Sequence, residues 1–168
     1  VILISDYGKG LLTHGLTQSL INVANENNKK LLVDPKGSDY SKYKDAFLLT
    51  PNKKEAFEAT KIAIKDNESL TKALISLKEK CNLSCSLITL SEEGVAVFDN
   101  ELRIHPTVAR EIFDVTGAGD TILASLGFAL ACSKDIDEAI KFANLDSGVV
   151  VGKIGSATVT LNEIIEYE

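Results

Sequence analysis

Short apolar runs alternate with longer amphipathic segments along most of this chain. The apolar runs predict strands, and segments with apolar residues three or four positions apart predict helices. The expected strands are Val1–Ser5, Lys30–Asp34, Ala46–Leu49, Ser86–Leu90, Val95–Asp99 and Leu102–Pro106. The expected helices are Gly15–Asn28, capped by Thr13, and Asn52–Thr60, Glu68–Lys80, Ala118–Cys132, Ile136–Val151 and Leu161–Tyr167. The alternation predicts a three-layer α/β fold, doubly wound, with a mostly parallel sheet covered on both faces.

Polar residues stand at the ends of four of these strands. They are Asp6, Asp34, Asn52 and Ser91. Ligands of open parallel sheets bind beyond the carboxyl ends of the strands, so we expect a ligand site there. The proline in Leu102–Pro106 favours an edge position for that strand. No internal repeat, low-complexity tract or linker interrupts the sequence, which predicts one domain over residues 1–168.

Charge and apolar patterning argue against two classes of partner. The formal net charge of −6 disfavours nonspecific binding to nucleic acid or anionic membranes. No apolar run approaches the roughly 20 residues of a spanning helix. Val1–Ile4 lacks the features of a signal peptide, and a cytoplasmic location is expected. The three cysteines are expected to be buried, reduced thiols, because Cys81 and Cys85 lack a second ligand pair for zinc.

The string Asp-Val-Thr-Gly-Ala-Gly-Asp-Thr, residues 114–121, comes at the entry to an apolar helical run. The first N–H groups of a helix have no internal partner and the helix dipole is positive there, so this end favours an anion. Gly117 and Gly119 permit close approach of a phosphate. Asp120 is suited to take the proton of a hydroxyl that attacks that phosphate. A tight loop before an Asp-capped helix is the plain alternative.

The longer string resembles the C-terminal signature of the ribokinase-like (phosphofructokinase B) sugar kinases. The resemblance implies that Asp120 is the catalytic base and that the amides of Gly117, Ala118 and Gly119 form the anion hole for the transferred phosphoryl group. It also implies that Asp114 acts with the loop Lys153–Ala157 at a monovalent cation such as K⁺.

The segment Asn52–Glu55 has a local and a functional interpretation. Asn52 as N-cap with Glu55 three residues later makes a capping box, which explains the pattern by itself. The resemblance implies that the same N-x-x-E motif organises the phosphates of Mg–ATP, the glutamate acting through metal-bound water. Asn52, Lys53, Lys54 and Glu55 are therefore assigned to the nucleotide, and Glu55 also to the metal. The two lysines could equally form a solvated helix face.

Three further residues are assigned by resemblance to the ribose and adenine. Ser91 and Gly94 lie in a segment that local pattern explains as a turn between strands, and the family has glycine where Ser91 or Glu92 stands. Asn144 resembles an adenine-side residue, although a polar residue on a helix face is more often merely exposed. His14 and His105 match no motif.

Two segments combine a strand end, a turn and a lysine: Ser5–Gly10 and Val33–Gly37. Solvated lysines in turns explain them, and phosphate contacts are the functional alternative. Together with residues 114–121 and 143–155 they resemble the kinase part of the bacterial heptose 7-phosphate kinases, which form part of bifunctional ADP-heptose synthases. Neither G-x-G-x-x-G after the first strand nor the G-x-x-x-x-G-K-[ST] loop is present, which disfavours a dehydrogenase and a P-loop enzyme.

The resemblance covers essentially the whole chain and implies transfer of the γ-phosphoryl group of ATP, with Mg²⁺, to a sugar hydroxyl. The subfamily implies D-glycero-D-manno-heptose 7-phosphate, phosphorylated at its anomeric position for ADP-heptose and lipopolysaccharide core synthesis. The chain lacks methionine and is expected to be part of a longer, homodimeric protein, without the N-terminal sugar-binding part and β lid, and therefore inactive alone. Another sugar or nucleoside kinase, or an inactive nucleotide-binding fragment, are the alternatives.

Overall fold

The computed structural model describes residues 1–108, 113–155 and 157–167, which fold into two compact units. Unit 1 comprises Val1–Leu90 and Ala96–Ile104, and unit 2 comprises Ser91–Val95 and His105–Glu168. The expectation of one domain over residues 1–168 stays a prediction.

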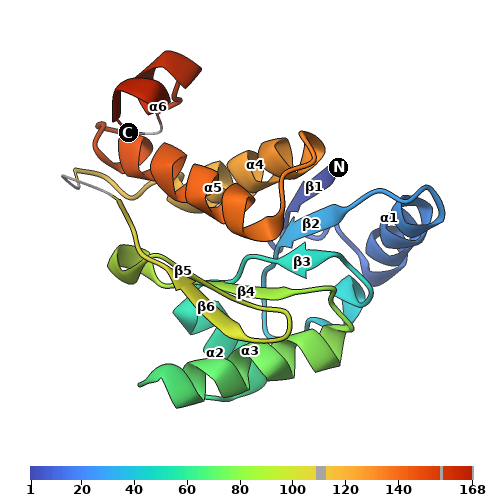
Figure 1. The fold of residues 1–168 in the computed structure, drawn as a ribbon. Coiled ribbons are helices and arrows are strands. Elements are labelled where there is room, and N and C mark those ends of the chain that lie inside the picture. Colours follow the sequence, from blue (N-terminus) through green and yellow to red (C-terminus); the bar gives the residue numbers. More distant parts are fainter. Residues whose placement is uncertain (109–112, 156, 168) are drawn as a thin grey trace. The chain divides into compact units, whose positions relative to one another are not determined.

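The helices and strands follow the expected order (Figure 1). The strands are β1 (Ile2–Ser5), β2 (Leu31–Asp34), β3 (Leu48–Leu49), β4 (Ser86–Thr89), β5 (Val95–Phe98) and β6 (Leu102–His105). The α-helices are α1 (His14–Glu26), α2 (Lys53–Thr60), α3 (Asn67–Cys81), α4 (Ala118–Ala131), α5 (Ile136–Val151) and α6 (Leu161–Tyr167). Two short 3₁₀ turns that the sequence did not predict are η1 (Ser41–Tyr43) and η2 (Ser91–Glu93).

Parallel pairing organises the strands of unit 1. β1 pairs with β2 and β2 with β3, both in parallel, so that Ser5 lies opposite Asp34. A single parallel bridge joins Asn52, after β3, to Thr89 at the end of β4. β4, β5 and β6 form a second set in that order, which confirms the edge position expected for β6. The parallel order brings the carboxyl ends of β1, β2 and β3 to one edge.

The apolar core of unit 1 fixes this register. Leu31 and Val33, two positions apart on β2, belong to one cluster of almost fully buried residues. The cluster also includes Ile21 of α1 and Leu74 and Leu77 of α3. Burial of each large aliphatic side chain contributes roughly 1.5–3 kcal/mol, and a one-residue slip of β2 would turn these residues away from the cluster. The helices α2 and α3 pack on each other and both contact β4.

Helix starts are set by local side-chain caps. Thr13 accepts a hydrogen bond from the Leu16 amide, as predicted. α3 and α5 begin with capping boxes that the sequence analysis did not single out, at Asp66 and Asp135. Such caps satisfy amides that the helix itself leaves without partners.

Unit 2 is built around α4 and α5, which lie alongside each other (Figure 1), with α6 packed on α5. Leu126 of α4 and Ile140 of α5 are fully buried. The turn between the two helices passes through Cys132, the exposed C-cap of α4. The expectation that all three cysteines are buried is therefore wrong for Cys132, because it lies where the helix ends at the surface.

Candidate functional site

The Gly-Ala-Gly-Asp string forms the start of α4 in unit 2. Gly117 is the N-cap, with a left-handed φ of 82° and no side-chain hydrogen bond capping the helix. Among the described residues, no heavy atom apart from chain neighbours and the helix itself lies within 4 Å of a Cβ placed on Gly117 or Gly119. A ligand can therefore approach this backbone closely. Asp120 lies exposed in the first helical turn.

One of the amides expected in the anion hole already has a partner. The N–H of Ala118 donates to the carbonyl of Val115 at 3.2 Å, a long bond for this donor and acceptor. The turn from Val115 to Ala118 thus closes on itself without a ligand. An anion at this helix end would compete with the Val115 carbonyl for that amide.

Asp114 joins this turn to the loop after α5. Its Oδ1 accepts the Thr116 amide at 2.9 Å and its Oδ2 accepts the Gly155 amide at 3.1 Å. These hydrogen bonds, those with Thr116 above all, hold the pKa of Asp114 below its ordinary value. The structure therefore brings Asp114 to the loop Lys153–Ala157, as expected, although Ser156 of that loop lies outside the described residues. A carboxylate has about four acceptor positions, so both oxygens retain capacity for a cation.

Asn52 and Glu55 form the expected capping box at the start of α2, in unit 1. Asn52 Oδ1 accepts the Glu55 amide at 2.9 Å, and Glu55 Oε2 accepts the Asn52 amide at 3.0 Å. The other carboxylate oxygen, Oε1, accepts a hydrogen bond from Lys36 Nζ at 3.0 Å. Lys54 is exposed and Lys53 half-buried in the same turn. The local interpretation is confirmed, and the roles of these residues toward a nucleotide stay predictions.

The polar residues at the strand ends of unit 1 converge. The Asp6 amide donates to the Asp34 carbonyl at 3.0 Å, and the Thr50 hydroxyl lies 3.4 Å from Asp34 Oδ1. Asn52 follows β3 at the same edge. Ser91 belongs to unit 2, so its place at this edge stays a prediction, as does the juxtaposition of Glu55 with the Asp114–Asp120 turn.

Gly94 and Ser91 lie in a tight turn of unit 2. Both have left-handed φ angles, 100° for Gly94 and 56° for the exposed Ser91. A Cβ on Gly94 would lie 2.7 Å from backbone atoms of Pro106 and Thr107 and would overlap the carbonyl oxygen of His105. Close packing against the 105–107 segment therefore explains this glycine on structural grounds alone.

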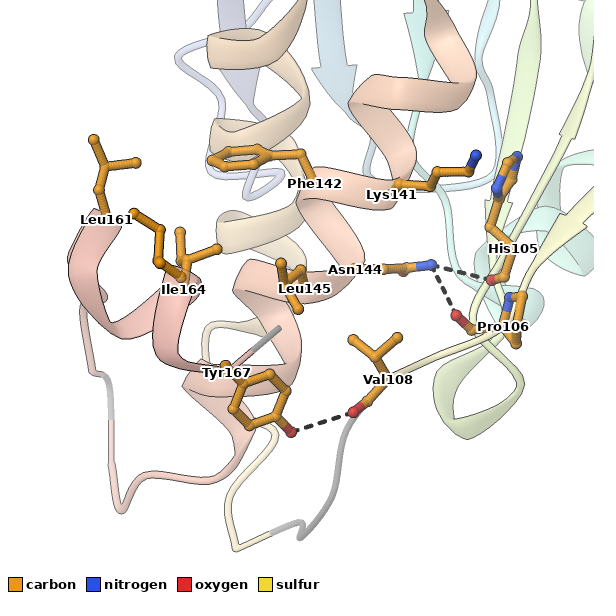
Figure 2. A pocket seen from close by; sticks show the side chains of 11 residues that line it. His105, Pro106, Val108, Lys141, Phe142, Asn144, Leu145, Leu161, Ile164 and Tyr167 are labelled. Atoms are coloured by element: carbon orange, nitrogen blue, oxygen red, sulfur yellow. Dashed lines mark hydrogen bonds between the residues drawn. The ribbon is translucent and has the colours of Figure 1, made fainter.

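Asn144 holds the same segment from α5. Its Nδ2 donates to the carbonyls of His105 and Pro106 at 3.1 and 3.3 Å (Figure 2). The side chain is buried, so the plain expectation of an exposed polar residue on a helix face is wrong. Its amide nitrogen serves the protein's own backbone, and contact with an adenine stays a prediction.

A cavity of about 770 Å³ adjoins Asn144 within unit 2 (Figure 2). Its lining residues come from the 105–108 segment, α5 and α6: His105, Pro106, Val108, Lys141, Phe142, Asn144, Leu145, Leu161, Ile164, Ile165 and Tyr167. Tyr167 Oη donates to the Val108 carbonyl at 3.3 Å. Volumes of 300–1,000 Å³ with mostly apolar walls and a few polar groups are typical of small-molecule sites.

The described residues hold no group of three or more His, Cys, Asp or Glu side chains placed to bind a metal ion. Mg²⁺ commonly uses only one or two carboxylates, with waters and substrate phosphates completing its shell. The Glu55 carboxylate, with acceptor capacity left on both oxygens, fits a water-mediated role of that kind. In the described part of the chain, every helix is too short or too polar to cross a membrane.

Three polar clusters were not found from the sequence. Asp6 accepts hydrogen bonds from Lys42 and Tyr43, His105 pairs with Asp137 at 2.7 Å, and Ser125 donates to the buried Asp146. Burial raises the pKa of Asp146, and the Ser125 hydrogen bond opposes that change. Each cluster joins residues more than 20 positions apart, and no local spacing marks them.

Comparison with known proteins agrees with the signature. A family model described as pfkB family carbohydrate kinase matches residues 10–163. The chain is 66% identical over 167 residues to the bifunctional protein HldE of Aliarcobacter butzleri, covering 99% of this chain and 35% of that protein. It is 62% identical over 167 residues to HldE of Sulfurimonas denitrificans, with the same coverage. The chain thus spans about a third of the length of these curated relatives.

Solved structures share the fold. Ribokinase from Arabidopsis thaliana, complexed with ribose and ATP, gives a TM-score of 0.84 at 18% identity, over 92% of this chain and 52% of that one. Phosphofructokinase-2 from Escherichia coli, in complex with potassium, gives 0.84 at 17% identity, over 98% of this chain and 55% of that one. The predicted ribokinase-like α/β fold is confirmed.

Proposed function

The chain belongs to the pfkB family of carbohydrate kinases, and we propose that the protein containing it transfers the γ-phosphoryl group of ATP to a sugar hydroxyl. The observation that carries this proposal is the start of α4. A left-handed glycine N-cap without a side-chain hydrogen bond, space at Gly119 and a carboxylate one residue later suit an anion and an attacking hydroxyl. The positive helix end stabilises charge on the transferred group.

For the acceptor we propose D-glycero-D-manno-heptose 7-phosphate, phosphorylated at its anomeric hydroxyl. Relatives that match 99% of this chain at 62–66% identity carry the name HldE and the description bifunctional. The segments Ser5–Gly10 and Val33–Gly37, which suggested this subfamily, lie together in unit 1, where the Lys36 stem packs on Gly8. Another sugar or a nucleoside is the alternative acceptor.

Each site residue has a distinct task in this proposal. Asp120 takes the proton of the sugar hydroxyl, while the amides at Gly117–Gly119 bind the transferred phosphoryl group. Glu55 would hold Mg²⁺ through water, and the charge of the ion would neutralise the phosphates, which Lys53 and Lys54 would contact. Asp114 with the Gly155 loop would hold K⁺.

The cavity beside Asn144 is the proposed adenine site, and Gly94 packs against the 105–107 segment, part of which lines this cavity. Its walls are largely apolar, its volume suits a purine, and backbone carbonyls lie at its rim. A purine needs an apolar pocket with a few fixed polar groups. The cavity lies in the same unit as the start of α4, so the proposal places the base and the transferred phosphoryl group on unit 2.

Asp120→Asn in the full gene product tests the proposal. Asp120 lies in the first turn of α4, whose N-cap is Gly117. Asparagine therefore loses only the charge–dipole attraction, about 0.3–1 kcal/mol, and the melting temperature should fall by less than about 4 °C. Turnover should fall by about 10²–10⁴-fold, as for loss of a general base, while ATP affinity is maintained. Asp66→Asn, at the start of α3, is the matched control and should change neither rate nor affinity.

The acceptors to compare in this assay are heptose 7-phosphate, ribose, fructose 6-phosphate and adenosine. Near-normal turnover by Asp120→Asn would reduce Asp120 to a negative charge that stabilises the first turn of α4. A wild-type protein that binds ATP but phosphorylates none of the acceptors would instead support a nonenzymatic nucleotide-binding protein.

A further inference from the structure

Both carboxylate oxygens of Glu55 are held by groups of the protein itself. Oε2 accepts the Asn52 amide at 3.0 Å, as a capping box requires, and Oε1 accepts Lys36 Nζ at 3.0 Å. The Glu55 side chain is only 13% exposed, whereas that of Lys36 is 54% exposed. The capping box holds only one of the two oxygens, and the ammonium of Lys36 adds a second point of attachment for the carboxylate.

Hydrogen bonding to a buried side chain anchors the backbone of Lys36. Its amide donates to Tyr43 Oη at 3.1 Å, and the fully buried Tyr43 donates its own hydroxyl proton to Asp6 Oδ2 at 2.6 Å. Asp6 is fixed in turn by Lys42 Nζ at 2.5 Å and by the Gly8 amide at 2.7 Å. The end of β1, η1 and the loop after β2 are thus tied together.

The side chain of Lys36 has one further restraint. Its Cγ lies 3.4 Å from the position of a Cβ on Gly8, so the stem packs on a residue without a side chain. Beyond that point the ammonium is partly exposed. Because its backbone is anchored and its ammonium is partly exposed, Lys36 can exchange Glu55 for another partner without a movement of its loop.

The ion pair itself contributes little to stability. Exposed lysine–carboxylate pairs are typically worth less than about 1 kcal/mol. Glu55, and more weakly Asp34 and Glu58, raise the pKa of Lys36, so the ammonium lies in acidic surroundings. A divalent cation recruited through Glu55 would repel it. The polyphosphate that arrives with the cation would offer a new partner, since a lysine binds phosphate as a point charge.

We propose that Lys36 is a positioning residue of the nucleotide site, which holds Glu55 in place before the ligand arrives and moves to the nucleotide phosphates when the metal–nucleotide binds. The inference rests on the proposed function, to which it adds a second, exchangeable cation. In this proposal the Asp6–Tyr43 pair fixes the position of the loop after β2, from which Lys36 reaches either Glu55 or the phosphates.

Lys36→Met in the full gene product removes the charge and retains the stem that packs on Gly8. Binding of ADP in the presence of EDTA should weaken by about five- to tenfold, the order of one partly exposed charged hydrogen bond. The Mg²⁺ concentration that half-saturates the ADP complex should fall about two- to threefold, because an ammonium that lies close to both Glu55 and the phosphates no longer repels the cation. Lys36→Arg retains the charge and should keep the ADP affinity within about twofold.

The measurement is isothermal titration calorimetry with ADP, with and without Mg²⁺, together with the melting temperature without ligand. Lys72→Met is the matched control, since it removes the exposed Lys72–Glu68 pair at 2.6 Å on α3 and should change neither constant. Both methionine variants should melt within about 2 °C of wild type.

Wild-type ADP binding with unchanged affinity and unchanged Mg²⁺ dependence in Lys36→Met would overturn the role of Lys36 and leave the proposed function standing. A wild-type protein that binds no ADP would overturn both. A loss of ADP affinity that Lys72→Met shares would reduce the effect to general surface charge and would also overturn the proposal.

Discussion

Gly119→Ala distinguishes an effect on protein stability from an effect on phosphate binding at the start of α4. Gly119 is the second residue of that helix, and an added Cβ meets no heavy atom within 4 Å among the described residues other than chain neighbours and the helix itself. The fold therefore gives no steric reason for glycine at this position.

Alanine should stabilise the protein here. Glycine is about 0.8–1.0 kcal/mol less favourable than alanine within a helix, and near a helix end roughly half of that is expected. For a domain of this size, such a gain raises the melting temperature by about 1–2 °C. Turnover should fall by about 10²-fold, the order for disturbing one donor of an anion hole, because the new methyl group occupies the space through which the phosphate approaches.

Gly15→Ala is the matched control, because Gly15 is also the second residue of its helix, α1, and also has open space around its Cβ position. It should raise the melting temperature similarly and leave turnover unchanged. Initial rates with ATP and heptose 7-phosphate, and calorimetric melting, are measured on all three proteins. Unchanged turnover in Gly119→Ala would refute the phosphate contact, and a drop of several degrees in melting temperature would refute the structural argument.

Three further substitutions test other parts of the site. Glu55→Gln retains a capping-box acceptor but removes the charge, so the Mg²⁺ concentration for half-maximal turnover should rise while the melting temperature stays the same; an unchanged Mg²⁺ requirement would leave Glu55 only a cap. Gly94→Ala forces a methyl group against the backbone of Pro106 at a φ of 100° and should cost about 2–4 kcal/mol of unfolding free energy by urea titration; a cost below 1 kcal/mol would contradict that packing. Asp6→Asn removes the buried partner of Lys42 and should cost on the order of 2–3 kcal/mol at pH 7. Burial raises the pKa of Asp6, but its hydrogen bonds with Lys42, Tyr43 and Gly8 outweigh burial and hold the pKa below the ordinary 3.8, so its contribution is present above about pH 4 and is lost as the pH falls through the folded pKa. The stability gap between Asp6→Asn and wild type should therefore narrow on acidification, and a gap that stays constant down to pH 3 would contradict the ion pair.

The sequence by itself determined the order and type of the regular elements and the start of several helices. Apolar periodicity depends on neighbours two to four positions apart, which is why the strands and helices matched their expected ranges closely. The same holds for the Thr13 cap and the Asn52–Glu55 capping box, where donor and acceptor are three residues apart. The start of α4 at its glycines could also be predicted from the sequence, because the residues that form it are consecutive.

Only the tertiary structure decided which distant side chains meet near the candidate site residues. Lys36 and Glu55 are 19 positions apart, Tyr43 and Asp6 are 37 apart, and Asn144 reaches the His105 carbonyl across 39. Cys132 was expected to be buried and is exposed, whereas Asn144 was expected to be exposed and is buried. Both expectations were wrong for the same reason, since burial depends on what packs against a residue from elsewhere in the chain. Local patterns specify which elements form, whereas the register of parallel strands and the packing of helices determine which polar groups meet, and no spacing within a short segment encodes that outcome.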